Sequence, residues 1–222
     1  MKPILFNTEM VRAILDDSKT VTRRVMKDIP LDAKCVFVCD DYATFRWQVK
    51  AKNANIVFDK EKDVAPPYRP GDILYVRETW TKLYYVDEHG YTHYDQPMYY
   101  YAADGVPDIT LIDPDGFEED DQRIRWRPSI HMPREAARIF LRVTDVRVER
   151  LQEIDEDGAI AEGLYRWWQL TRASTPAGTA RQAFMWLWQH LTRKAPVEQG
   201  WAANPWVWVI AFERCSKPEE TP

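Results

Sequence analysis

The sequence predicts an α+β protein in which strands predominate, and two observations lead to this prediction. Short segments rich in β-branched and aromatic residues outnumber the segments with helical periodicity. The expected helices are interspersed among the strands without a regular strand–helix–strand alternation, which argues against a parallel α/β fold. The length of 222 residues suits one large domain or one domain with a sizeable insertion. We therefore expect a single domain over residues 1–222, with a bent or closed sheet.

The N-terminal part begins with a short apolar strand at residues 3–6. Asn7 or Thr8 can cap the helix that follows, in which the apolar side chains fall on one face. Residues 18–25 are basic and β-branched, and they predict a loop that leads into a strand.

The middle of the chain predicts further strands at residues 35–38 and 44–49. The sequence Pro70-Gly71-Asp72 has proline and glycine where a tight turn requires them. A strongly apolar strand is expected directly after that turn, at residues 73–80.

Residues 82–128 differ from their surroundings and predict an insertion. Seven tyrosines lie between Tyr84 and Tyr101, and eight acidic residues without a basic one lie between Asp104 and Asp121. This composition favours a hairpin followed by a solvated loop.

The C-terminal part predicts a long strand at 137–151, a short helix at 155–164 and an amphipathic helix at 176–192. Residues 204–213 are apolar at both alternating positions, which is typical of a strand covered on both faces. A polar tail follows at 216–222.

Composition excludes several classes of protein. The chain has 30 basic and 35 acidic residues, a net charge of −5 and a pI near 5.5, so it lacks the broad basic field of a non-specific nucleic-acid coat. No apolar run approaches the ~18 residues of a membrane span, and the N-terminal run is too short for a signal peptide. Three cysteines, an odd and sparse count, indicate reduced thiols in a cytoplasm.

The most informative segment for chemistry is residues 19–27, which contains four basic residues and no acidic one. If it is extended, Thr20, Thr22 and Arg24 face one way and Lys19 lies at the start of that row. Hydroxyls beside cations suit an anion or a polar nucleobase, but a solvated basic edge strand has the same composition. No glycine-rich phosphate loop is present, and four scattered histidines without a CxxC pair predict no metal site.

Two further places are candidates. Glu162 lies near the end of the short helix, and it is a functional candidate only if the fold brings it close to Lys19 and Thr22. Arg77 and Glu78 alternate on a strand, so at least one of them is expected to be buried and paired. The nucleotide-binding candidates are Thr20, Arg23, Arg24, Arg77, Glu78 and Trp80.

The order of these segments resembles an ASCH domain of the PUA-like superfamily, of the larger phage and prophage type. The resemblance rests on Ser18-Lys19-Thr20-Val21-Thr22-Arg23-Arg24, Pro70-Gly71-Asp72-Ile73-Leu74, Ala159-Ile160-Ala161-Glu162-Gly163 and the closing strand Trp206–Glu213. It covers both ends and the middle of the chain, but 82–128 and 165–203 fall outside the family's minimal pattern. The chain also departs from the family at Asp17, where glycine is usual, and at Thr22, where glutamate is frequent.

The resemblance implies a small PUA-like β-barrel flanked by helices and a role connected with nucleosides or RNA. Small bacterial members are amidohydrolases that remove the acetyl group from N4-acetylcytidine, and other members have been associated with RNA binding or cleavage. Carried over by position, the catalytic residues would be Lys19, Thr22 and Glu162. The implied partner is a modified nucleoside or single-stranded RNA, no cofactor is expected, and the sequence gives no oligomeric state.

Two mechanisms and three functions remain open from the sequence. Thr22 could attack as a nucleophile if Lys19 were neutral, or a cationic Lys19 could stabilise the oxyanion while Glu162 activates water. We expect an amidohydrolase. The alternatives are a non-catalytic RNA-binding module that uses Lys19, Arg23, Arg24 and exposed aromatic residues, and a ribonuclease that uses Lys19 with Glu162 or a histidine.

Overall fold

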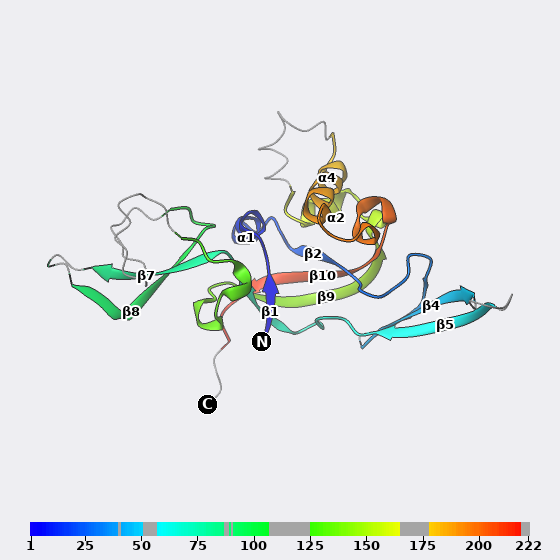
Figure 1. Ribbon diagram of the computed structural model, residues 1–222, viewed down its shortest axis with the longest axis horizontal. Helices are drawn as coiled ribbons and strands as arrows, with labels where there is room; N and C mark the ends of the chain where they lie inside the picture. Colours follow the sequence, from blue (N-terminus) through cyan, green and yellow to red (C-terminus); the bar gives the residue numbers. More distant parts are fainter. Residues whose placement is uncertain are drawn as a thin grey trace. The chain divides into compact units, whose positions relative to one another are not determined.

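A computed structural model of the protein describes residues 1–39, 41–50, 57–86, 89, 91–106, 125–164 and 178–218. It confirms a mixed α+β architecture made mostly of strands with few helices (Figure 1). Most of the predicted acidic stretch and the tail beyond residue 218 lie outside the described residues.

The strands are β1 (Lys2–Leu5), β2 (Val21–Val25), β3 (Lys34–Val38), β4 (Ala43–Lys50), β5 (Val57–Val64), β6 (Ile73–Arg77), β7 (Trp80–Val86), β8 (Thr92–Tyr101), β9 (Phe140–Arg150) and β10 (Trp206–Cys215). The helices are α1 (Thr8–Leu15), α2 (Glu156–Ala161) and α4 (Ala180–Thr192). Short 3-10 turns occur at Ser129–His131, Arg134–Ala136, Leu151–Glu153, Val197–Gln199 and Trp201–Ala203.

Hydrogen bonding orders five strands as β1-β6-β9-β10-β2, three as β3-β4-β5 and two as β7-β8. Of these, β1 pairs with β6 in parallel, whereas β2 pairs with β10 antiparallel. Each of the three orders begins and ends on different strands, so the strands that the structure describes form no closed barrel.

The chain divides into two compact units. The first comprises Met1–Asp16, Leu74–Leu141 and Arg214–Pro222, and the second comprises Asp17–Ile73 and Arg142–Glu213. The single domain expected over residues 1–222 stays a prediction.

In the first unit, α1 begins where the sequence places its cap. The Asn7 side chain accepts a hydrogen bond of 2.8 Å from the Met10 backbone N–H, which satisfies one of the free donors of the first turn. Val11 and Ile14 on the apolar face of α1 are buried, as are Ile4 of β1 and Val76 of β6, which lie opposite each other in the parallel pair.

The predicted strand at 73–80 is wrong in one respect, because the structure divides it. Strand β6 ends at Arg77 and β7 begins at Trp80, and the β7–β8 hairpin therefore starts before the expected boundary at residue 82. The break coincides with Glu78, whose backbone N–H donates to the Met132 sulfur and not to a neighbouring strand.

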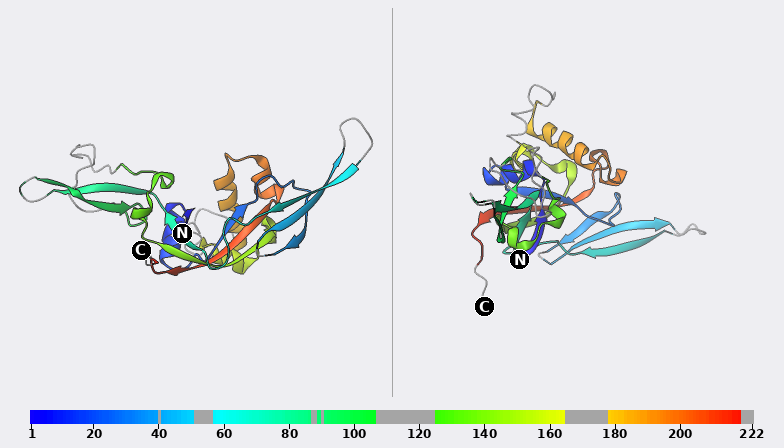
Figure 2. Two further views of the ribbon diagram at one scale, coloured as in Figure 1. Left: turned by 90° about the horizontal axis from the view of Figure 1, so that it is seen from below. Right: turned by 60° about the vertical axis from the view of Figure 1, so that its left-hand side comes forward.

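In the second unit, helices α2 and α4 pack together, as Figures 1 and 2 show. A core cluster that contains Ala159, Phe184 and Val207 joins them to β10, and Val21 and Val25 of β2 pack against it. Residues Val207–Ile210 of β10 are at most 5% exposed on either face, which confirms the prediction of a covered strand.

Sequence reasoning missed β5, which runs beside β4 along its whole length (Figure 1). The segment Asp59-Lys60-Glu61-Lys62-Asp63 carries charges at every position, and it therefore lacks the alternation of apolar residues that predicts a strand. Its ladder with β4 is strengthened by cross-strand pairs such as Arg46 with Glu61, whose Nη2 and Oε2 are 2.7 Å apart.

Candidate functional site

The backbone of the second unit places Lys19 directly beside Glu162. These two residues form an isolated antiparallel bridge, and the Thr20 N–H donates to the Ala161 carbonyl at 2.9 Å. Thr20 in turn accepts a hydrogen bond of 2.8 Å from the Phe212 N–H of β10. The segment before β2 is therefore fixed between the end of α2 and strand β10.

The Lys19 side chain is fully buried, and its ammonium group has an acceptor for each of its three protons. The Nζ atom lies 2.6 Å from Glu162 Oε2, 3.1 Å from the Glu162 carbonyl and 2.8 Å from the Val21 carbonyl. The two side chains of the ion pair are 0% and 5% exposed. Such a pair requires this close geometry, since an ammonium without compensation would be strongly unfavourable at this depth.

Arg23 extends the ion pair into a network. Its Nη1 lies 3.3 Å from Glu162 Oε1, and its Nη2 lies 3.2 Å from Glu149 Oε2 of β9. The guanidinium also lies over the Phe184 ring, 5.8 Å from the ring centroid. Its Nε is buried and has no hydrogen-bond partner among the described residues.

Gly158 leaves the space that this guanidinium occupies. A Cβ at this position would lie 3.0 Å from Arg23 Nη2 and 2.8 Å from the Asp155 carboxylate that caps α2. Sequence reasoning named neither Glu149 nor Gly158; the only local signal was a glycine in the first turn of a short helix.

Burial lowers the pKa of the Lys19 ammonium below its ordinary value. The charge and hydrogen bond of Glu162 oppose this effect, and the nearby Arg24 and Arg23 reinforce it. Burial also lowers the pKa of Arg24, while Tyr68 and Glu162 act in the opposite direction. The network therefore holds a lysine that releases its proton more readily than a surface lysine does.

The extended conformation predicted around residue 22 is confirmed, and it divides the candidate residues between two faces. Alternation along β2 puts Thr22 and Arg24 on the face opposite Arg23. Thr22 is 3% exposed and lies opposite Ile210 of β10, whereas Thr20 is exposed. The structure thus brings Lys19, Arg23 and Glu162 together, with Thr22 on the other face of the strand from Arg23.

Arg77, Glu78 and Trp80 belong to the first unit and have their own partners there. Arg77 donates to the Ile130 carbonyl, and Glu78, 1% exposed, binds Arg138 with Nε and Oε1 3.0 Å apart. The buried Trp80 ring lies under the Arg127 guanidinium, whose carbon is 5.6 Å from the ring centroid. The expectation that Arg77 or Glu78 is buried and paired is confirmed for Glu78.

The described residues contain neither a metal-binding cluster nor a membrane-spanning helix. Within them, no three histidine, cysteine, aspartate or glutamate side chains lie close enough to hold a metal ion. In the same part of the chain, no helix is long and apolar enough to cross a membrane.

Comparison with known proteins leaves the family open. No protein-family model matches the sequence, and no curated protein is significantly similar to it. Among solved structures, the crystal structure of protein EF3133 from Enterococcus faecalis V583, a DUF984 protein, is similar over 100% of this chain and 86% of that one, with 9% identity and a TM-score of 0.37.

Proposed function

We propose that this chain is an ASCH-type protein with a PUA-like fold, and that it hydrolyses the amide bond of an N4-acylated cytosine nucleoside in the cytoplasm. The observation that carries the proposal is the contact between Lys19 and Glu162, which are 143 positions apart in the sequence and only 2.6 Å apart in the fold. The three cysteines are free thiols, in keeping with a reducing compartment.

The geometry favours attack by water over attack by Thr22. The Glu162 side chain lies at the end of α2, where one oxygen binds Lys19 and the other binds Arg23. A carboxylate held in this way can take a proton from water as the water oxygen bonds to the acyl carbon. Thr22 is less well placed to attack a substrate bound at Lys19 and Glu162, because it lies on the opposite face of β2 from Arg23.

Lys19 supplies the proton that the leaving group needs. When the bond between the acyl carbon and the cytosine N4 breaks, the amine takes a proton from the Lys19 ammonium, and the proton gained by Glu162 returns to Lys19. One water and one amide thus give one carboxylic acid and one amine. A lysine whose pKa is lowered by burial is a better donor for this step. To reach the substrate, Nζ must exchange one of its two carbonyl hydrogen bonds.

The alternative functions are supported less well. An RNA-binding surface needs several cations accessible together, but the Lys19 and Arg23 side chains are 0% and 1% exposed and are bound to carboxylates. The amidohydrolase needs access to the Lys19–Glu162 pair alone. A ribonuclease could use the same Lys19–Glu162 pair. The two functions therefore differ in their substrate and not in the arrangement of these residues.

The test is to incubate the purified chain with N4-acetylcytidine and to measure cytidine and acetate by liquid chromatography. We expect turnover that falls by about 10²–10⁴-fold in Glu162→Gln and in Lys19→Met. Matched controls are Glu198→Gln and Lys194→Met, at exposed positions outside the network. A short single-stranded RNA incubated in parallel detects ribonuclease activity. Cleavage of that RNA without release of acetate would contradict the proposal.

A further inference from the structure

The buried ion pair of the second unit belongs to a longer series of charged contacts that reaches the surface on β9. Glu162 Oε2 lies 2.6 Å from Lys19 Nζ, and Glu162 Oε1 lies 3.3 Å from Arg23 Nη1. Arg23 Nη2 donates to Glu149 Oε2 at 3.2 Å, and Arg147 Nε donates to Glu149 Oε1 at 2.6 Å. The exposed fraction of the side chain rises from 0% at Lys19 to 20% at Glu149 and 45% at Arg147. Glu149 therefore links the buried pair to groups in contact with solvent.

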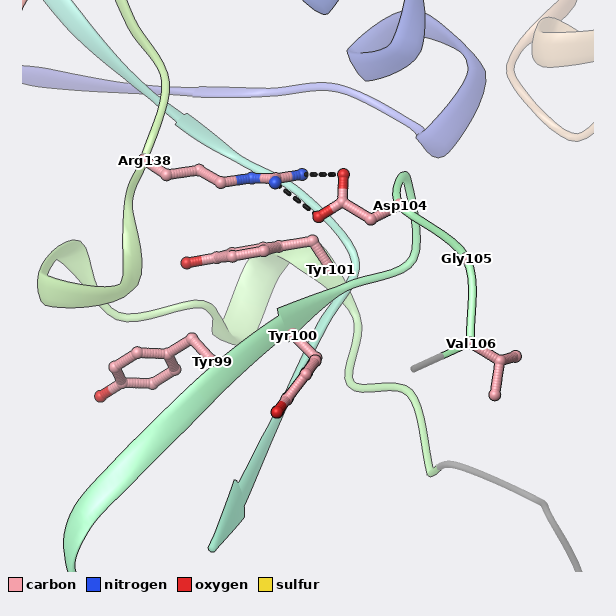
Figure 3. Close-up of a pocket in the computed structure, with 7 residues that line it drawn as sticks. All are labelled: Tyr99, Tyr100, Tyr101, Asp104, Gly105, Val106 and Arg138. Atoms are coloured by element: carbon pink, nitrogen blue, oxygen red, sulfur yellow. Dashed lines mark hydrogen bonds and ion pairs between the residues drawn. The ribbon is translucent and has the colours of Figure 1, made fainter. Parts of the chain in front are cut away.

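An arginine of the first unit shows how a guanidinium of this protein binds a carboxylate through two nitrogens. Arg138 Nη1 and Nη2 lie 2.6 and 3.0 Å from the two oxygens of Asp104 (Figure 3). The same guanidinium binds Glu78 through Nε and Nη2, and its carbon lies 3.9 Å from the centroid of the Tyr101 ring. Such paired N–H···O bonds are the strongest form of contact between arginine and a carboxylate.

Arg23 binds its two carboxylates differently, with one nitrogen for each. Glu149 holds Nη2, so Nη1 alone reaches Glu162, where it contacts Oε1. The other oxygen of Glu162 is left to Lys19. If Nη2 were released, Arg23 could bind both oxygens of Glu162 and compete with Lys19 for Oε2. Glu149 therefore keeps the two cations on separate oxygens of Glu162.

This division of contacts bears on the protonation of Lys19. The charged groups that act on Lys19 are Glu162 at the end of α2 and Arg24 and Arg23 on β2. Burial and the two arginines act to lower the pKa of Lys19, and Glu162 opposes them. A contact between Glu162 and Lys19 that is weakened by competition from Arg23 would lower this pKa further. The protonated form of Lys19 is the one that donates to the leaving amine.

We propose that Glu149 is a positioning residue for the hydrolysis, which holds Arg23 so that Glu162 keeps one oxygen for the Lys19 ammonium. The inference rests on the proposed function, but the contacts that carry it are present without substrate. Glu149 acts through Arg23, and no contact with the substrate is assigned to it.

The first experiment measures the rate of N4-acetylcytidine hydrolysis by the full chain as a function of pH. In Glu149→Gln, Lys19 should lose its proton at lower pH, so the alkaline fall in kcat should move to lower pH by about 0.5–1 unit. Glu149→Asp keeps the charge and should move it clearly less. The matched control is Glu61→Gln, which removes an exposed carboxylate bound to Arg46 and should leave the profile unchanged.

A second experiment separates this inference from the proposed function. Nuclear magnetic resonance of isotope-labelled lysine follows the titration of Lys19 without substrate, and Lys19→Met identifies its signal. The titration midpoint of Lys19 should be lower in Glu149→Gln than in wild type. If the wild-type chain does not hydrolyse N4-acetylcytidine, the proposed function is wrong, and this titration alone tests how Glu149 acts on Lys19.

Two results would overturn the inference. These are a Lys19 midpoint in Glu149→Gln equal to that of wild type, and a shift of the same size in Glu61→Gln. Circular dichroism of each variant verifies that a change in the midpoint or in the rate does not come from unfolding.

Discussion

The two units of this protein each hold a basic side chain against a carboxylate, but at different depths. In the second unit, the side chains of Lys19 and Glu162 are 0% and 5% exposed. In the first unit, those of Arg138 and Asp104 are 28% and 52% exposed. Lys19 binds one carboxylate and two backbone carbonyls, whereas Arg138 binds two carboxylates. The clusters therefore differ in solvent access, in countercharge and in the choice of lysine or arginine.

This contrast reverses the direction in which the pKa of the cation moves. Burial dominates at Lys19 and lowers its pKa despite the contact with Glu162. At Arg138, burial also acts to lower the pKa, but the hydrogen bonds and charges of Glu78 and Asp104 raise it above its ordinary value. The lysine cluster is therefore suited to proton transfer, and the arginine cluster to holding a fixed charge.

The largest expected effect is on the buried lysine cluster. Glu162→Gln should lower the free energy of unfolding by about 3–5 kcal/mol, because it leaves Lys19 buried without a countercharge. Urea unfolding followed by circular dichroism measures this change, with Glu198→Gln as the control. The double variant Lys19→Met/Glu162→Gln should recover much of the loss. A single variant as stable as the control would show that the ion pair is not sequestered from water.

The pH dependence of stability should also separate the lysine cluster from a surface pair. Because the pKa of Lys19 is lowered on folding, the unfolded chain binds more protons than the folded chain between that lowered pKa and 10.5. Stability contributed by this residue should therefore rise with pH up to 10.5. Urea unfolding at several alkaline pH values should show the free energy of wild type rising relative to that of Lys19→Met. If the free-energy difference between wild type and Lys19→Met falls as the pH rises, the pKa of Lys19 is raised on folding.

A smaller loss is expected in the first unit. Glu78→Gln removes the charge opposite Arg138, which keeps its two contacts with Asp104 and its partial access to water. The free energy of unfolding should fall by about 1–3 kcal/mol, the range for a charged hydrogen bond. The same denaturation measurement applies here. A loss equal to that of Glu162→Gln would remove the distinction between the two clusters.

The smallest effect concerns the ring beneath Arg138. Tyr101→Phe keeps the ring but loses the hydroxyl that donates to the Ala136 carbonyl at 2.6 Å, which should cost about 1 kcal/mol of stability. Alkaline titration followed by tyrosinate absorbance should lose one ionisation near pH 12, since the pKa of Tyr101 is raised to about 12. If the ionisation that disappears lies near pH 10, the hydroxyl is not held as described.

Local signals in the sequence predicted much of the fold. Asn7 or Thr8 was expected as a helix cap because such side chains bind free backbone donors, and residues 204–213 were expected to form a strand covered on both faces because both alternating positions are apolar. The charged strand β5 was missed, because cross-strand pairing and not apolar alternation stabilises it. The break at Glu78 was missed because it depends on contacts with Met132 and Arg138, which are remote in the sequence.

The candidate site was predictable only in part. Local composition indicated Lys19 and Arg23, and the family resemblance supplied Glu162. Glu149 binds Arg23 across 126 positions of sequence, and Arg138 binds Glu78 across 60. Ion pairs between residues so far apart in the chain leave no periodic pattern in a single sequence. Extended geometry near Thr22 was predicted correctly, and with it the placement of Thr22 and Arg24 on one face of β2 and Arg23 on the other.

The most direct test of the central claim is the rate of cytidine release from N4-acetylcytidine by the wild-type chain and by Lys19→Met/Glu162→Gln. The double variant removes both charges of the pair, so it should keep the circular dichroism spectrum and most of the stability of wild type. The account predicts measurable hydrolysis by wild type and a loss of at least about 10²-fold in the folded double variant. Equal rates in the two proteins, or no hydrolysis by wild type, would contradict it.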